Sequence, residues 1–115
     1  MRRSEDFRRT VRGGVRVGRL TLVLHAALTD TDRAQVGFVV GKNIGNAVTR
    51  NRVRRRLRHL AAAELTRTAD PVSVVIRALP PAATASEQLP ADFASAWPQA
   101  LARLTRRPAT AGSSR

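Results

Sequence analysis

The chain has 115 residues, 43% of them hydrophobic, and a formal net charge of +13 at pH 7 from 21 Lys and Arg against eight Asp and Glu. This length and composition indicate one globular domain and exclude a disordered polycation. The absence of cysteine excludes disulfides and thiolate metal sites, and no apolar run approaches the roughly 20 residues that span a bilayer. No signal peptide is visible, so we expect a soluble, cytoplasmic protein without a membrane partner, whose partner is a polyanion.

Residues 1 to 14 are predicted to form a short helix, which a glycine pair ends. Phe7 and Val11 are four positions apart and therefore share one face of this helix. Apolar pairs at this spacing usually belong to a core. Taken alone, the two residues therefore favour docking of the helix over binding of a ligand.

Two strands are expected next, at residues 15 to 28 and 34 to 40, where branched and aromatic residues alternate with polar ones. In the first strand, His25 is predicted to be structural or solvent-facing, because a lone histidine on a strand rarely has a catalytic partner. Asp30 and Asp32 lie between the strands. We expect them to form a polar turn and not a metal site, since no other carboxylate is near in sequence.

A basic helix is predicted from a cap at Asn46 to about Arg67. From Lys42 to Arg58 the sequence holds seven basic residues and no acidic one. A merely solvated helix face would interleave both signs, because like charges at i and i+4 repel by roughly 0.2–0.5 kcal/mol each. Apolar side chains recur with a 3.6-residue period, so the helix should dock on a core and turn its arginines outward. This stripe consists of Val53, Leu57, Leu60, Ala61 and Leu65.

A further strand at 72 to 77 and a last helix at 86 to 104 complete the predicted domain, residues 1 to 104. Pro98 removes a hydrogen bond inside that helix at a cost of ~3 kcal/mol, so we expect a kink or two shorter pieces. Residues 105 to 115 are expected to be a disordered tail. The order α-β-β-α-β-α predicts an α+β fold with one small mixed sheet. The apolar face of the last helix is predicted to carry Phe93, Trp97, Leu101 and Leu104.

No catalytic or metal-binding residue and no small-molecule cofactor is predicted. The acidic residues are scattered, and His25 and His59 lie on different elements, so neither a carboxylate metal site nor an acid–base pair is evident. The sequence also has no phosphate-binding glycine loop, no helix-turn-helix or zipper pattern and few aromatic residues for base stacking. Charge alone leaves DNA and RNA open as the polyanion.

The basic stretch resembles the signature of the protein component of bacterial ribonuclease P. The matching residues are Lys42-x-x-Gly45-Asn46-Ala47-Val48-x-Arg50-Asn51-Arg52-x-Arg54-Arg55-x-x-Arg58. The resemblance also includes Arg3-Ser-Glu-Asp-Phe7 and Arg33-x-x-Val-Gly-Phe-Val-Val, and covers roughly residues 2 to 104. It implies a single-domain α/β sandwich, similar to a ribosomal-protein domain-2 fold. In that fold a left-handed βαβ crossover carries the basic helix, an exception to the right-handed rule.

The resemblance implies the protein subunit of an endoribonuclease whose catalyst is its RNA subunit. Such a holoenzyme removes the 5′ leader of precursor tRNA by Mg²⁺-dependent hydrolysis, with Mg²⁺ bound mainly by the RNA. The residues implied to face the catalytic RNA are Lys42, Asn46, Arg50, Asn51, Arg52, Arg54, Arg55 and Arg58. The residues implied to line a cleft for the single-stranded leader are Phe7, Val11 and His25.

Three features depart from the family pattern. Positions 11 and 25 are often aromatic in relatives, so Val11 and His25 predict weaker stacking on the leader. The basic segment that usually precedes the first helix is absent, which indicates an internal start at Met1 or a short extension. Pro98 is unusual in the last helix. A non-enzymatic basic RNA-binding or ribosome-associated protein is the alternative, because charge alone fits both.

Overall fold

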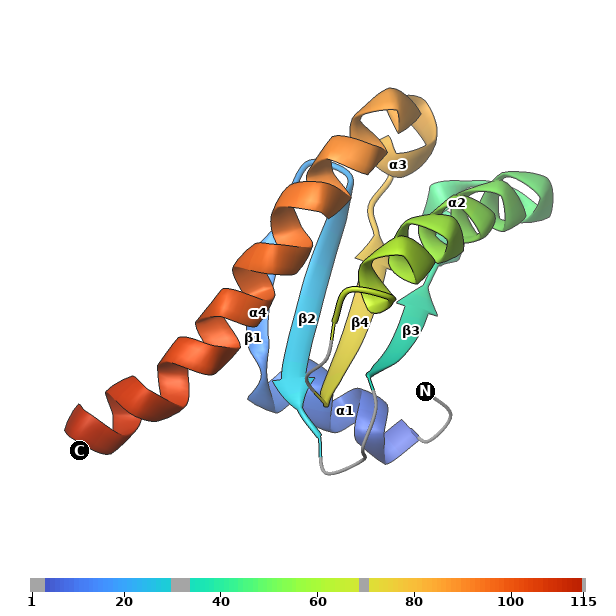
Figure 1. Ribbon diagram of the computed structural model, residues 1–115. Helices are drawn as coiled ribbons and strands as arrows, with labels where there is room; N and C mark the ends of the chain where they lie inside the picture. Colours follow the sequence, from blue (N-terminus) through green and yellow to red (C-terminus); the bar gives the residue numbers. More distant parts are fainter. Residues whose placement is uncertain (1–3, 30–33, 69–70, 115) are drawn as a thin grey trace.

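The computed structural model describes residues 4–29, 34–68 and 71–114, with side chains described for 9–29, 34–68 and 71–104. A four-stranded sheet lies between helices (Figure 1). Its strands are β1 (Val15–Gly18), β2 (Leu22–Leu28), β3 (Gln35–Val39) and β4 (Val72–Ala78). The helices are α1 (Ser4–Gly13), α2 (Ala47–Leu65), α3 (Pro81–Thr84) and α4 (Leu89–Ser114), with 3₁₀ turns η1 (Lys42–Ile44) and η2 (Ser86–Gln88).

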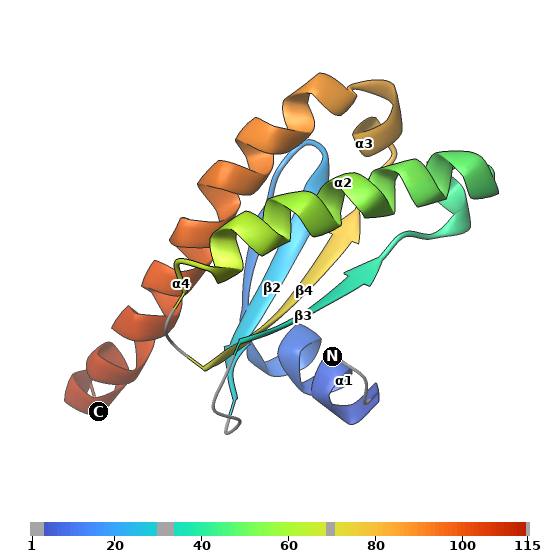
Figure 2. The ribbon, with the colours of Figure 1, turned by 45° about the vertical axis from the view of Figure 1, so that its right-hand side comes forward.

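The sheet is mixed, in the order β1-β2-β4-β3. β1 and β4 each pair with β2 in antiparallel fashion, whereas β3 pairs with β4 in parallel. A parallel pair needs a crossover connection, and α2 supplies it. Seen from the side of α2 with both strands pointing up, the chain passes from β3 on the right to β4 on the left (Figures 1 and 2). The crossover is therefore left-handed, which confirms the predicted fold class.

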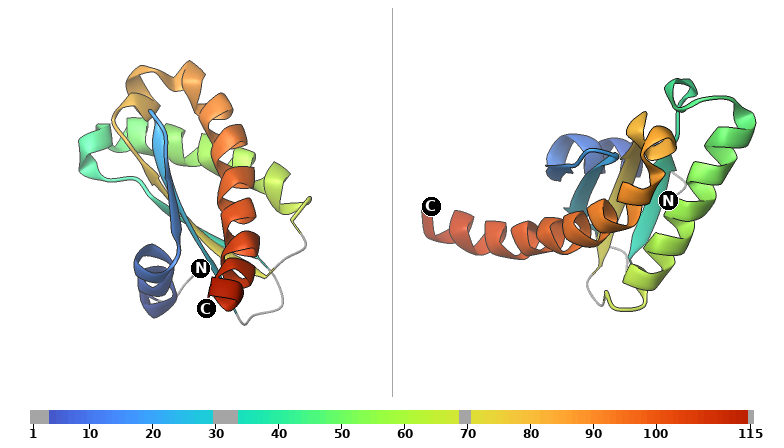
Figure 3. Two further views of the ribbon diagram at one scale, coloured as in Figure 1. Left: turned by 90° about the vertical axis from the view of Figure 1, so that its left-hand side faces the viewer. Right: turned by 90° about the horizontal axis from the view of Figure 1, so that it is seen from above.

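Alternation along the strands gives the sheet two different faces. α4 lies on one side of the sheet and α1 on the other (Figure 3, left). The side of α2 and α4 holds the hydrophobic core. The strands contribute to it Val15, Val17, Leu22, Leu24, Ala26, Val72, Val74, Ile76 and Ala78. The helices contribute Val53, Leu57, Ala61, Leu89, Phe93, Ala96, Trp97, Ala100 and Leu104, with Leu101 packed against them, which confirms the predicted apolar face of the last helix.

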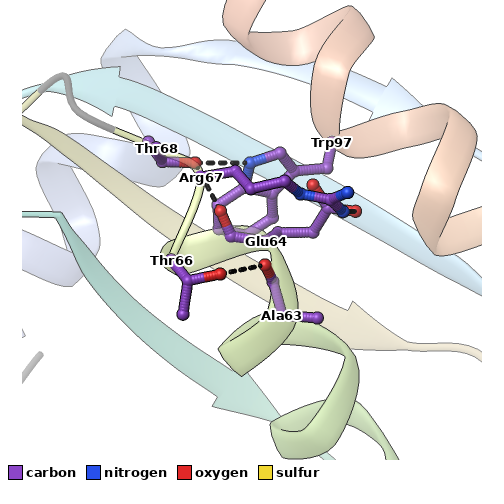
Figure 4. A network of polar contacts seen from close by, with 6 residues as sticks. All are labelled: Ala63, Glu64, Thr66, Arg67, Thr68 and Trp97. Carbon is purple, nitrogen blue, oxygen red and sulfur yellow. Dashed lines mark hydrogen bonds and ion pairs between the residues drawn. The ribbon is translucent and has the colours of Figure 1, made fainter.

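The C-terminal end of α2 is fastened to α4 by a short chain of hydrogen bonds (Figure 4). The last carbonyls of a helix lack partners within the helix. Here the hydroxyl of Thr68 donates to the carbonyl of Glu64 at 2.8 Å and accepts from the indole Nε1 of Trp97 at 3.2 Å. The hydroxyl of Thr66 donates to the carbonyl of Ala63 at 2.8 Å. These bonds fix the end of the basic helix relative to the core.

α1 packs on the opposite face of the sheet, against β2 and β4. Its described contact with β4 is polar: the buried hydroxyl of Thr10 donates to that of Ser73 at 3.0 Å. A Cβ built at Gly14 would lie 2.0 Å from the carbonyl oxygen of Ala26, so only glycine permits this close approach. Val11 is half-buried, and the side chain of Phe7 lies outside the described residues. We call this side of the sheet the α1 face.

Several details of the chain differ from the sequence predictions. Residues 15 to 28 form two strands, because the chain turns after Gly18 and β1 pairs back on β2. The last helix is continuous through Pro98, so the two-piece alternative is wrong. Pro98 is exposed, and so is Ala94, whose carbonyl would otherwise accept from position 98, so water can replace the missing donor.

The predictions for two segments are not tested by the described residues. The backbone of α4 continues to Ser114 where a disordered tail is predicted, and the side chains beyond residue 104 lie outside the described part. The domain boundary at residue 104 therefore stays a prediction. The predicted turn with Asp30 and Asp32 also lies outside the described residues.

One buried carboxylate joins the turn between β1 and β2 to the start of α4. Asp92 is 7% exposed, and its Oδ2 accepts from the backbone N–H of Thr21 at 2.9 Å and from its hydroxyl at 2.7 Å. We predict that Asp92→Ala lowers the free energy of unfolding by about 2–3 kcal/mol, because two buried donors lose their acceptor. Urea denaturation with an unchanged m-value measures this loss. The exposed Glu87→Ala is the control, expected to change it by less than ~0.5 kcal/mol; equal losses would contradict the assignment.

Candidate nucleic-acid interface

The start of α2 is set by two residues of the signature stretch. Asn46 is the N-cap, and its Oδ1 accepts from the backbone N–H of Thr49 at 2.9 Å, as the sequence predicts. Gly45 has φ = 149°, a conformation that side chains rarely adopt, and a Cβ there would meet the Thr49 side chain at 3.0 Å. Together these residues turn the chain from η1 into the helix.

The orientation of α2 follows from its apolar stripe. Val53, Leu57 and Ala61 are at most 3% exposed, and Leu60 and Leu65 pack at the edge of the core, which confirms the predicted stripe. The opposite side is exposed. It presents Asn51, Arg52, Arg55, Arg58 and His59, and Lys42 and Asn46 are exposed at the N-terminal end.

Arg50, Arg54 and Arg56 flank the buried stripe and are half-buried. Arg54 Nη1 donates to the side-chain oxygen of Asn51 at 3.0 Å, which holds its guanidinium beside the exposed face. Arg50 Nε is buried and has no hydrogen-bond partner among the described residues. The helical period places Arg56 among the outward arginines, but the structure corrects this. Its Nη1 donates to the carbonyl of Ser86 at 3.1 Å, so Arg56 joins α2 to η2.

The basic residues on the exposed face of α2 form no ion pair with a carboxylate of residues 9–29, 34–68 or 71–104. The acid nearest in sequence, Glu64, lies at the far end of the helix and pairs with Arg67 at 3.0 Å. The helix N-terminus adds partial positive charge of its own. The structure therefore gathers six of the eight predicted RNA-facing residues on one exposed surface, with Arg50 and Arg54 at its border. We call these eight residues the α2 basic face.

The α1 face of the sheet carries a second group of basic residues. In register, Arg16 on β1 is opposite His25 on β2. Arg77 on β4 is two positions along from Val75, the partner of His25, and therefore lies on the same face of the sheet. Arg16 and Arg77 are exposed, whereas His25 is 6% exposed and its Nδ1 is buried without a hydrogen-bond partner in the described part of the chain. Burial, followed by the charges of Arg77 and Arg16, lowers the pKa of His25 below its usual value of 6.5.

The structure thus brings α1 and His25 to one face but leaves His25 with little exposed surface. Sequence reasoning missed Arg16 and Arg77, although each is a charged residue within an apolar strand. Arg16 is placed beside His25 by the pairing of β1 with β2, and Arg77 by the pairing of β2 with β4, about fifty positions away in the sequence. Residue spacing alone gives neither register. Among residues 9–29, 34–68 and 71–104, no three His, Asp or Glu side chains form a metal site.

Comparison with known proteins gives the family. The family model described as ribonuclease P matches residues 1–101. The chain belongs to the ribonuclease P protein family. The ribonuclease P protein component of Acidothermus cellulolyticus is 46% identical over 99% of this chain and 94% of its own length. That of Kocuria rhizophila is 47% identical over 90% of this chain and 92% of its own length.

Solved structures show the same fold. The ribonuclease P protein of Staphylococcus aureus superposes with a TM-score of 0.78 at 22% identity, covering 90% of this chain and 94% of its own. The Thermotoga maritima protein has a TM-score of 0.67 at 21% identity, covering 92% and 94%. With family membership, this identifies a protein subunit of a ribonuclease in tRNA processing, whose catalyst is the RNA. The ribosome-associated alternative is not favoured.

The lowered pKa of His25 has a consequence for stability. Because the folded protein binds this proton more weakly than the unfolded chain, the stability is complete above pH ~6.5 and falls as the pH drops through the lowered folded pKa. We predict that His25→Gln flattens the pH dependence of urea unfolding below about pH 7, where one such group contributes at most ~1.4 kcal/mol per pH unit. An unchanged slope in His25→Gln would refute this origin.

Proposed function

We propose that the α2 basic face binds the catalytic RNA of ribonuclease P and that the α1 face holds the 5′ leader of precursor tRNA. In the holoenzyme the RNA hydrolyses the phosphodiester bond and binds most of the Mg²⁺ that this step requires. The observation that carries the proposal is the exposed row of guanidinium groups on a helix fixed by a buried stripe.

The α2 basic face suits the phosphates of a folded RNA. Arginine presents a planar fork of donors that matches a phosphate bidentately. Arg54 is held in place by Asn51, so one guanidinium is oriented before the RNA arrives. Bringing cations to closely spaced phosphates reduces their repulsion, which is the role that Mg²⁺ otherwise fills. A protein subunit of this kind should therefore lower the Mg²⁺ requirement without a carboxylate site of its own.

The α1 face suits a single strand bound mainly through charge. Arg16 and Arg77 are exposed on either side of the strand that carries His25. His25 and the half-buried Val11 offer little surface for base stacking, which agrees with the weaker stacking expected at these positions. The leader would thus be held by its phosphates over a floor that includes His25, with Phe7 as a proposed neighbour.

We propose a cytoplasmic location, where tRNA precursors are made in bacteria. No helix in the described ranges is long and apolar enough to cross a membrane.

Reconstitution with bacterial ribonuclease P RNA tests the function. Adding this protein should lower the Mg²⁺ concentration at which the RNA cleaves precursor tRNA, measured as the midpoint of a Mg²⁺ titration of the cleavage rate. If the protein binds the RNA but leaves that midpoint unchanged, the role as its subunit is wrong. A basic RNA-binding protein of another kind would then explain the charge.

The double substitution Arg52→Ala with Arg55→Ala tests the α2 basic face. Both side chains are exposed and carry no described structural contact, so the thermal unfolding midpoint should change little. Binding to the catalytic RNA should weaken, and the slope of log K against log salt should decrease by about 2, roughly one per lost phosphate contact. Arg67→Ala, at the far end of α2, is the control and should retain the slope. Loss of folding in the double variant would instead make these arginines structural.

A further inference from the structure

The free edge of the sheet at β1 carries two basic residues, Arg19 and Arg103, that neither proposed RNA site uses. Arg19 lies in the turn after β1, and Arg103 reaches β1 from α4. Arg16, whose carbonyl accepts the hydrogen bond from Arg103, lies three positions before Arg19 and is exposed on the α1 face. We call Arg16, Arg19 and Arg103 the β1-edge patch. We propose that this patch binds phosphates of leader nucleotides farther from the tRNA than those on the α1 face, an inference that rests on the proposed function.

Arg19 is held rigidly by neutral acceptors. Its Nε donates to the hydroxyl of Ser95 at 2.8 Å, its Nη1 to the carbonyl of Gly18 at 2.9 Å, and its Nη2 to Gln99 Oε1. A guanidinium has five N–H donors, so these three bonds leave two for a ligand. The acceptors carry no charge, so Arg19 keeps its full positive charge in a fixed position. Ordering a side chain before binding reduces the entropy that binding costs.

Arg103 adds a second charge at the same edge. Its Nη1 donates to the carbonyl of Arg16 at 2.9 Å, which satisfies one of the backbone acceptors that an edge strand leaves unpaired. The carboxylate on this part of α4, Asp92, is buried and accepts both its hydrogen bonds from Thr21. A neutral hydrogen-bond donor would suffice to satisfy the carbonyl of Arg16 at the edge of β1. The positive charge of Arg103 is not needed for that bond, and it suits an anionic partner.

The position of the β1-edge patch in the sheet favours the leader, and not the catalytic RNA, as its ligand. The strand order is β1-β2-β4-β3, and α2 contacts β3, so the patch lies at the opposite edge from the α2 basic face (Figure 1). The α1 face, in contrast, continues into the patch, because Arg16 is the register partner of His25. A strand that leaves His25 toward β1 meets Arg16 first and then the edge. Leu20, 58% exposed in the same turn, offers an apolar surface to an unstacked base.

Leader length provides the test. In the reconstituted holoenzyme, affinity is measured for precursor tRNAs with leaders of about 3, 6 and 12 nucleotides. For Arg19→Gln with Arg103→Gln, we expect affinity for the shortest leader to match wild type. Affinity for the longest should fall about fivefold or more, with a salt slope smaller by about 2. Arg67→Gln is the matched control and should match wild type at every length.

Other outcomes overturn the inference. An equal loss of precursor affinity at all leader lengths would place the effect on the α1 face or on assembly of the holoenzyme. Weaker binding of the catalytic RNA in the absence of substrate would assign the patch to that RNA. Unchanged affinity at every length would show that the patch does not bind the leader. Arg103→Gln alone removes one hydrogen bond at an exposed residue and should fold. If the double variant unfolds, this single variant must show a smaller, length-dependent loss, or the inference fails. Failure of the proposed function is distinct, because wild-type protein would then not lower the Mg²⁺ requirement.

Discussion

The docking of α2 on the core is the interaction on which the rest of the molecule depends. Arginine pairs at i and i+4, such as Arg50 with Arg54, oppose this helix by roughly 0.2–0.5 kcal/mol each. Burial of side chains such as Val53 and Leu57 contributes about 1.5–3 kcal/mol each and outweighs that repulsion. The bond from Trp97 to Thr68 then fixes the far end of the helix. A helix of this charge would be unstable alone, so the core determines where its guanidinium groups lie.

The mixed sheet separates two basic surfaces within one small domain. The parallel pair of β3 and β4 forces a crossover, and its left hand places α2 on the same side as α4. α1 and His25 remain on the other side, because side chains alternate along β2. The α2 basic face and the α1 face therefore do not compete for one surface. In a ribonucleoprotein, such a domain can contact its RNA subunit and a substrate strand at the same time.

Local sequence patterns predicted much of this arrangement, whereas features set by tertiary packing, strand register or exposure were missed. Spacing sufficed for the α2 stripe and for the Asn46 cap, since both involve residues within a few turns. It could not show that Arg56 turns to Ser86, that Arg19 is held by α4, or that Arg16 lies beside His25, because each depends on tertiary packing or strand register. The continuous α4 was missed because the cost of Pro98 depends on exposure, which the sequence does not give. The left-handed crossover came only from family resemblance.

The charge arrangement is consistent with a protein whose catalytic partner is RNA. The described carboxylates, Glu64, Glu87 and Asp92, come from α2, η2 and α4, and none comes from the strands. Two of them already have partners, Glu64 in Arg67 and Asp92 in Thr21. An acidic side chain on the α1 face would repel the leader, and a cluster of them would compete with the RNA for Mg²⁺. The lowered pKa of His25 favours a neutral imidazole, so the buried ring adds no charge to the α1 face. The positive charge of that face comes instead from Arg16 and Arg77, whose exposed positions require little desolvation.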